Sequence, residues 1–275
     1  MIDLLKIEWL KIKNYTAFKV MAIFFALGII LSNYVVQLFY NNVLEETGEG
    51  AVMLASFKPY AFTSTWQTTS YVSGFLLMLP AMLLIMLITN EYMFRTNRQN
   101  VIDGWSRHQF ISVKIVMALI FAIVSTLIVF LTGLGFGFAT KTDISWNGID
   151  HVGFFFLKAL TYNLFAILIS VLVKKTGFAV GLFFIYLGAE NFASQLLNVY
   201  SMKIKADSKT DIGSIGNYLP MNAADGLLTF PENPLSSTAN KAFATDFVYI
   251  ILSFAIAYII IFTWASWKKY RTADI

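Results

Sequence analysis

Six long apolar runs separated by polar segments dominate the pattern along the chain. Each run has roughly 20 residues or more, the length at which an α-helix crosses the hydrocarbon core of a bilayer. The pattern therefore predicts an all-α integral membrane protein that forms a single transmembrane domain. The six transmembrane helices are expected over residues 20–40, 67–89, 110–139, 153–173, 177–198 and 247–267.

Residues 1–19, before the first run, have the pattern of an amphipathic helix. Four apolar residues share one helical face: Ile2, Leu5, Trp9 and Ile12. Lysines flank this face, so we expect the helix to lie in the headgroup region of the membrane. No small-residue cleavage site follows, which favours a retained first span over a removed signal peptide.

Composition supports a membrane protein and narrows its chemistry. Hydrophobic residues make up 57% of the 275 residues and charged residues 13%, about half the charged share of an average soluble domain. The chain has no cysteine, and its two histidines, His108 and His151, lie in different loops. Disulfides, thiolate chemistry and cysteine metal sites are therefore excluded, and we expect no metal site.

Basic residues are concentrated in alternate polar segments. The two termini and the loops after the second and fourth runs hold most of the lysines and arginines. Cytoplasmic segments of membrane proteins carry this excess. We therefore expect a multi-pass protein of a bacterial cytoplasmic membrane, with both termini in the cytoplasm.

The polar segment 90–109, between the second and third runs, is called the central loop here. Residues 96–103 have a helical pattern, and Gly104 is placed to end that helix. Ser106 and Gln109 have the S-x-x-Q spacing of a capping box, which predicts the start of the next spanning helix.

The central loop resembles the cytoplasmic loop of ABC-2 type ABC transporter permeases. That loop runs roughly E-x-x-x-G-T, then S-R, and then a lysine seven positions on. The matching residues here are Glu91, Thr96, Ser106, Arg107 and Lys114, with Arg95 at the place where the family commonly has glycine. The resemblance extends over the whole chain, with an amphipathic start, six spans and a long loop before the last span.

The resemblance implies that the central loop is a coupling helix that docks on a separate ABC ATPase subunit. The residues that it assigns to ATPase coupling are Glu91, Arg95, Thr96, Arg98, Asp103, Gly104, Ser106, Arg107 and Lys114. For the N-terminal helix, a simple anchor and an additional contact with the ATPase are both open.

The resemblance also implies the permease subunit of an ATP-driven exporter for an amphipathic or hydrophobic substrate. A second copy or a close paralogue would complete the complex, which would contact membrane lipids and no nucleic acid. ATP and magnesium would bind the partner ATPase, and this chain would hold no cofactor. Peptide antibiotics, lipids, drugs and polysaccharide precursors are all open as cargo.

Two motifs could be mistaken for enzyme chemistry. Residues 133–142 are superficially like a phosphate-binding loop, but Thr140 rather than glycine precedes Lys141. The glycines there are expected to allow close helix packing. Glu91 and Arg95 make the E-x-x-x-R pair of CAAX-type intramembrane proteases, which also need a second acidic residue and histidines within the spans. We expect that pair to be a structural ion pair, and the chain to be no enzyme.

The alternatives to a permease are therefore a six-span assembly or structural protein without transport, and the intramembrane protease.

Ionisable residues interrupt two of the apolar runs. Glu190 and Asn191 lie in the fifth run, and Lys158 lies in the fourth at a comparable distance from the same end. Such residues are costly in a membrane and usually face a bundle interior or a pathway. We favour an ion pair between Glu190 and Lys158 over a direct contact with substrate along a translocation path.

The polar stretch 199–246 precedes the last run and contains a short apolar patch. This pattern predicts short helices that rest in the outer leaflet. The resemblance implies a re-entrant cap above the translocation path.

Overall fold

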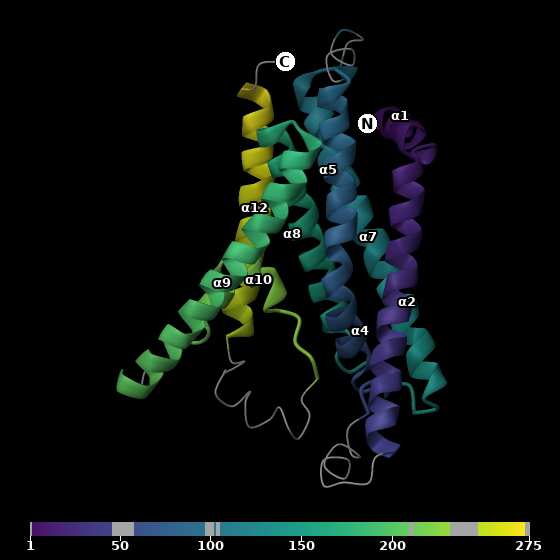
Figure 1. Cartoon of the computed structure of the whole chain (residues 1–275), viewed down its shortest axis with the longest axis vertical. Coiled ribbons are helices and arrows are strands. Elements are labelled where there is room, and N and C mark those ends of the chain that lie inside the picture. The colour runs from purple at the N-terminus through teal and green to yellow at the C-terminus, as the bar shows by residue number, and fades with distance from the viewer. Residues whose placement is uncertain are drawn as a thin grey trace.

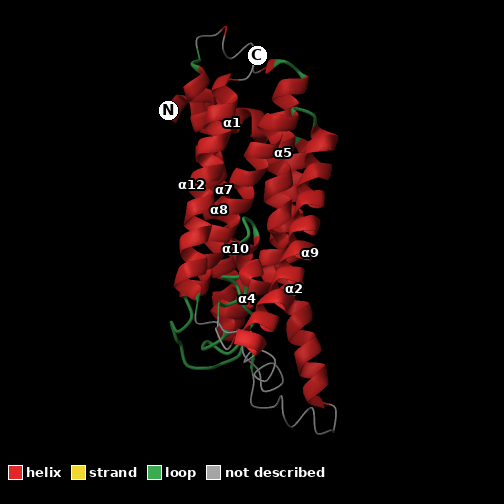
Figure 2. Cartoon of the chain, turned by 90° about the vertical axis from the view of Figure 1, so that its left-hand side faces the viewer, coloured by secondary structure: helices red, strands yellow, loops and turns green. Residues whose placement is uncertain are grey.

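The computed structural model describes residues 2–45, 58–96, 102, 105–208, 212–231 and 247–272. Helices and loops make up this described part, as Figure 2 shows. The elements in chain order are α1 (Ile2–Lys13), α2 (Thr16–Glu45), α4 (Thr65–Gly74), the 3-10 helix η1 (Phe75–Leu77), α5 (Met78–Met93), α7 (Arg107–Ala139), α8 (Asp150–Val173), α9 (Thr176–Ser208), the 3-10 helix η2 (Ile215–Tyr218), α10 (Asn222–Asp225) and α12 (Val248–Thr272).

Within the described residues, six helical stretches are long and apolar enough to cross a membrane. They are α2, the continuous stretch α4–η1–α5, α7, α8, α9 and α12. Each covers one of the predicted segments, except that α12 begins at Val248, one residue after the predicted start at 247. The prediction of an all-α protein with six span-length helices is confirmed. The fold defines a multi-pass helical membrane protein.

The long helices run along the long axis of the molecule (Figure 1). Both termini, α1, the end of α5 and the start of α7 lie at one end of the bundle, which we call the proximal end. The end of α2, the turn between α7 and α8, and the C-terminal end of α9 lie toward the opposite, distal end. The central loop therefore emerges at the same end as both termini.

Helix α8 forms the core of the bundle. It packs against α4, α5, α7, α9 and α12, and most of its side chains are buried. Helix α9 is different, because it packs on the bundle near its start and then diverges from it toward the distal end (Figure 1).

The second span is interrupted by the 3-10 helix η1, which ends at Leu77, and Pro80 follows in the first turn of α5. Proline has no N–H to donate, and its ring collides with the carbonyl group four residues earlier, here that of Leu76. The regular α-helical hydrogen bonding therefore breaks between α4 and α5.

Several predicted boundaries were wrong. The amphipathic helix α1 ends at Lys13 rather than at residue 19, and α2, which contains the first span, already begins at Thr16 rather than at residue 20. Helix α9 continues to Ser208, about ten residues beyond the predicted start of the polar stretch at 199. The polar C-terminal end of α9 still has a buried face and an exposed face: Ser201 is buried and Lys203 is exposed.

Residues 212–231 fold back against the bundle as η2 and α10. Their buried side chains include Met221, Ala223 and Leu227. Gly216 lies directly against α9, where its N–H donates to Oδ1 of Asn198 at 2.9 Å. A Cβ atom at Gly216 would collide with the carbonyl oxygen of Ser194, so the close approach of η2 to α9 requires glycine.

Two glycines of α7 allow close packing, as predicted. A Cβ atom at Gly137 would lie 2.7 Å from Cε1 of Phe62, and one at Gly133 would lie 3.1 Å from Oγ1 of Thr69. Gly135, between them on the same helix, would have no atom within 4 Å of an added Cβ. The glycines on the inner face of α7 therefore serve packing.

We predict that Gly137→Ala lowers the free energy of unfolding by about 1–3 kcal/mol, because the new methyl group overpacks the buried ring of Phe62. Gly135→Ala is the matched control and should leave stability unchanged or raise it by up to about 1 kcal/mol, since alanine favours the helix. Thermal unfolding of the purified variants in one detergent measures both. Equal losses at the two positions would contradict the packing role.

Candidate functional site

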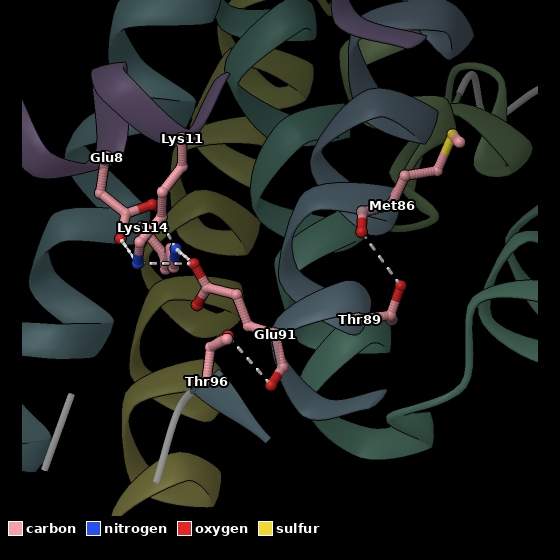
Figure 3. Close-up of polar contacts among 7 residues, drawn as sticks. All are labelled: Glu8, Lys11, Met86, Thr89, Glu91, Thr96 and Lys114. Atoms are coloured by element: carbon pink, nitrogen blue, oxygen red, sulfur yellow. Dashed lines mark hydrogen bonds and ion pairs between the residues drawn. The ribbon is translucent and has the colours of Figure 1, made fainter. Parts of the chain in front are cut away.

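Four charged side chains from three helices meet at the proximal end of the bundle (Figure 3). The ammonium group of Lys114, on α7, lies 2.6 Å from Oε2 of Glu8 on α1 and 2.8 Å from Oε1 of Glu91 on α5. Lys11 of α1 lies 2.9 Å from Oε1 of Glu8 and 3.2 Å from Oε1 of Glu91. We call these four residues the proximal cluster; its two carboxylates balance its two ammonium groups.

The proximal cluster is deeply buried. The side chains of Lys114, Glu8 and Glu91 are 1%, 3% and 10% exposed, and that of Lys11 is 33% exposed. Ions removed from water need close partners of opposite charge, and breaking a buried pair leaves an uncompensated charge. The cluster therefore fixes α1, α5 and α7 relative to one another.

Local packing places each member of the cluster. Glu8 and the buried Ile12 lie four residues apart on α1, so both face the bundle. The Lys114 ammonium lies 5.0 Å from the ring centroid of Phe110, and that of Lys11 lies 5.7 Å from the ring of Trp105. These aromatic faces add attraction to the cations.

The charged forms of the two α1 residues are favoured. Burial by itself would raise the pKa of the Glu8 carboxyl, but the ammonium groups of Lys114 and Lys11 outweigh burial and lower that pKa. Burial would lower the pKa of Lys11, but the carboxylates of Glu91 and Glu8 outweigh it and raise that pKa.

Three buried polar groups in and beside the proximal cluster make no hydrogen bond within the described residues. Within the described residues, Oε2 of Glu91 and the hydroxyl groups of Tyr92 and Tyr270 are buried without a hydrogen-bond partner. Tyr270 belongs to α12, where its ring stacks on that of Phe110 at 4.7 Å. The last helix thus also reaches the proximal cluster.

The central loop starts with a backbone conformation that favours glycine. Helix α5 ends at Met93, and Arg95 has a φ of 56°. The left-handed conformation costs a non-glycine residue about 1–2 kcal/mol, so this position would favour glycine. The hydroxyl of Thr96 donates to the carbonyl oxygen of Glu91 at 3.4 Å, which holds the turn.

The end of the central loop is capped as predicted. The Ser106 hydroxyl accepts from the N–H of Gln109 at 3.2 Å, and the Ser106 N–H donates to Oε1 of Gln109 at 2.9 Å. The capping box that starts α7 is therefore confirmed.

The structure divides the predicted coupling residues into different environments. Arg98, Asp103 and Gly104 lie outside the described residues, as does most of the predicted helix 96–103. Arg107 donates from Nη1 to the carbonyl oxygen of Arg271 at 2.9 Å, so it holds the end of α12.

One predicted pair needs correction. Glu91 and Lys114 are buried at the base of the central loop. The ion partners that the described residues provide for Glu91 are Lys11 and Lys114, and the exposed Arg95 is not one of them. The predicted ion pair of Glu91 with Arg95 was wrong, because Arg95 lies beyond the end of α5 and not on the same helical face.

The predicted ion pair between Glu190 and Lys158 was also wrong. Lys158 instead lies 3.1 Å from Oδ1 of Asp225. Oε1 of Glu190 accepts from the N–H groups of Met221 at 2.6 Å and Asn222 at 2.8 Å. The reason is that the segment 212–231 folds back against α9 and supplies partners to both residues.

Asn191, the neighbour of Glu190, is exposed and donates to the carbonyl oxygen of Leu187 on its own helix at 3.1 Å.

Sequence reasoning missed Glu8 and Asp225. Glu8 had a usable signal, since a single carboxylate on the apolar face between Leu5 and Ile12 indicates a buried partner. Asp225 had none, because nothing local distinguishes it from the other acidic residues of the 199–246 stretch.

The chain belongs to the family described as protein of unknown function (DUF2705), whose profile matches residues 26–275. The match includes Glu91 and Lys114 and begins after Glu8 and Lys11. The searches of curated proteins and of solved structures found no match.

We predict that Lys114→Met lowers the free energy of unfolding by about 3–5 kcal/mol, because two buried carboxylates lose their shared cation. Lys6→Met is the control: Lys6 pairs with Asp3 at 3.3 Å, but both side chains are largely exposed, at 71% and 90%, and such pairs contribute little. Thermal unfolding in detergent compares the two variants, and similar unfolding temperatures would exclude a stabilising role of the cluster.

The cluster should also make stability depend on pH. The folded pKa of Glu8 is lower than its ordinary value of 4.5. The stabilisation is therefore complete above that value and is lost as pH falls through the folded pKa. The charged groups facing Glu8 are Lys114 and Lys11, with Glu91 beside them.

We expect Glu8→Gln to flatten the decrease in unfolding temperature as pH falls below about 5. Parallel curves for the variant and the wild type would show that Glu8 does not cause the acid sensitivity.

Proposed function

We propose that this chain is the membrane-spanning permease subunit of an ATP-driven exporter of the ABC-2 type. Its central loop docks on a separate ATPase subunit at the cytoplasmic face of the membrane. The observation that supports this proposal most is the closure of the loop at its base by the proximal cluster.

A loop that transmits force must be joined firmly to the helices on both sides. Glu91 lies at the start of the central loop and Lys114 lies two turns into α7, and the two are 2.8 Å apart. Glu8 joins both to α1 through Lys114. A displacement of the loop is therefore passed to three helices together. A simple connection between two spans would have no need for four charges removed from water.

The surface beside the cluster suits a protein partner. Met93, Phe94 and Ile102 are 56%, 73% and 83% exposed, and they lie at or beyond the end of α5. Exposed apolar side chains with nearby basic groups such as Arg95 are typical of contact surfaces. In this proposal, ATP and magnesium bind the partner, and this chain supplies the path and the docking surface.

The distribution of charge supports the orientation. Besides the central loop, the proximal end carries Lys174 and Lys175 between α8 and α9, and Lys268 and Lys269 near the end of α12. The positive-inside rule places this end in the cytoplasm. A second copy or a close paralogue would complete the membrane part, as the resemblance to the permeases implies.

We predict that Phe94→Asp abolishes association with the ATPase, because a charge replaces an apolar contact on the docking surface. The full chain, tagged and purified from its native membrane, should carry a nucleotide-binding subunit and hydrolyse ATP, and the variant should lose both. Ile144→Asp is the matched control, since Ile144 is similarly exposed, at 59%, in the distal turn. It should keep the ATPase. Equal recovery from both variants, or no ATPase with the wild type, would overturn the proposal.

A further inference from the structure

A second buried polar group lies in the distal half of the bundle and contains Lys158 of α8, Glu190 of α9 and Asp225 of α10. We call these three residues the distal site. Asn222, which donates to Glu190, and Asp225, which pairs with Lys158, are three residues apart on α10. Both therefore lie on the same side of that short helix.

The charges of the distal site do not balance. It has two carboxylates and one ammonium group, whereas the proximal cluster has two of each. The relative exposures of Lys158 and Glu190 are each only 7%. An uncompensated charge at such a place is costly, and it usually marks a site that another charged group completes.

Glu190 has a carboxylate oxygen that accepts no hydrogen bond within the described residues. Its Oε1 atom accepts three hydrogen bonds, from the N–H groups of Met221 and Asn222 and from Nδ2 of Asn222 at 3.1 Å. Its Oε2 atom is buried and has no hydrogen-bond partner within the described residues, although Tyr186 lies nearby, one turn earlier on α9. A group that donates N–H would satisfy this oxygen.

The environment of Lys158 shows which chemistry the site accepts. Its ammonium lies 3.1 Å from Oδ1 of Asp225, and it lies 5.7 Å and 5.6 Å from the ring centroids of Phe75 and Tyr162. A carboxylate combined with aromatic faces is the usual receptor for an alkylammonium group. Gly74 makes room for the Lys158 ammonium, because a Cβ atom added at Gly74 would lie 3.1 Å from Nζ of Lys158.

The distal site lies close to the surface of the bundle at Asp225 and Phe75. The Asp225 side chain is 24% exposed, and Phe75, next to the Lys158 ammonium, is 58% exposed. The ring of Tyr71 packs edge-on against both Phe75 and Phe230. Aromatic side chains thus lie at this part of the surface, which suits the apolar part of an amphiphile.

We propose that the distal site binds the alkylammonium group of a cationic amphiphile. The ammonium donates to Oε2 of Glu190 and neutralises the excess carboxylate, while the apolar part packs on the rings of Phe75 and Tyr71. This inference rests on the proposed function in one respect: it takes a cationic amphiphile to be the class of molecule that the exporter transports.

Isothermal titration of the purified full chain in lipid nanodiscs tests the site. The probe is 2-phenylethylammonium, and 2-phenylethanol is its uncharged counterpart. We expect the ammonium to bind at least about tenfold more tightly than the alcohol, the difference typical of a charge-assisted hydrogen bond. Equal affinity for the two probes would overturn the proposal.

Two variants should change the affinity for the ammonium in opposite directions. Glu190→Gln keeps an oxygen that accepts from the Met221 and Asn222 N–H groups but removes the charge, and it should weaken binding about tenfold. Lys158→Met removes the internal competitor and should strengthen binding. Asp143→Asn, at an exposed position of the distal turn, controls for surface charge and should change nothing.

A merely structural role would lower stability in both variants without this opposite effect. Unchanged affinity in Glu190→Gln and Lys158→Met would overturn the site. Since the ATPase takes no part in the titration, a negative result leaves the docking proposal intact, and loss of the ATPase interaction leaves the binding result intact.

Discussion

The proximal half of the molecule depends on one buried cation. The ammonium of Lys114 is held between carboxylates at 2.6 Å and 2.8 Å that come from two other helices. None of the three groups can be removed without leaving a charge in a medium that solvates it poorly. The position of α1 against the bundle and the closure of the central loop at its base follow from this arrangement.

The two buried polar groups differ in charge balance, and this difference separates their roles. The proximal cluster is neutral as a whole, so it is complete in the folded chain and favours one fixed geometry. The distal site keeps one excess carboxylate and is formed partly by α10, a helix of only four residues. It lies where α9 diverges from the bundle (Figure 1). One end of the molecule is therefore built to stay rigid, and the other is built to accept another group.

The sequence was sufficient where the causes are local. The length of the apolar runs predicts the six helices, and the spacing of Ser106 and Gln109 predicts the cap of α7. The partners of Glu190 and Lys158 were not predictable, because they depend on how residues 212–231 fold back against α9. Glu8 was missed because α1 was predicted to lie on the membrane surface, whereas the face of α1 that carries Glu8 packs on other helices of the protein.

The proximal cluster also constrains the order in which the molecule can be assembled. Glu8 precedes the first span in the chain, whereas its buried partner Lys114 follows only with the third span. Until then, Glu8 can still pair with Lys11 on its own helix, as it does in the folded chain at 2.9 Å. That pair gives the Glu8 carboxylate a partner of opposite charge before Lys114 is in place. Helix α1 can therefore complete its buried contacts only after α5 and α7, which carry Glu91 and Lys114, are in place.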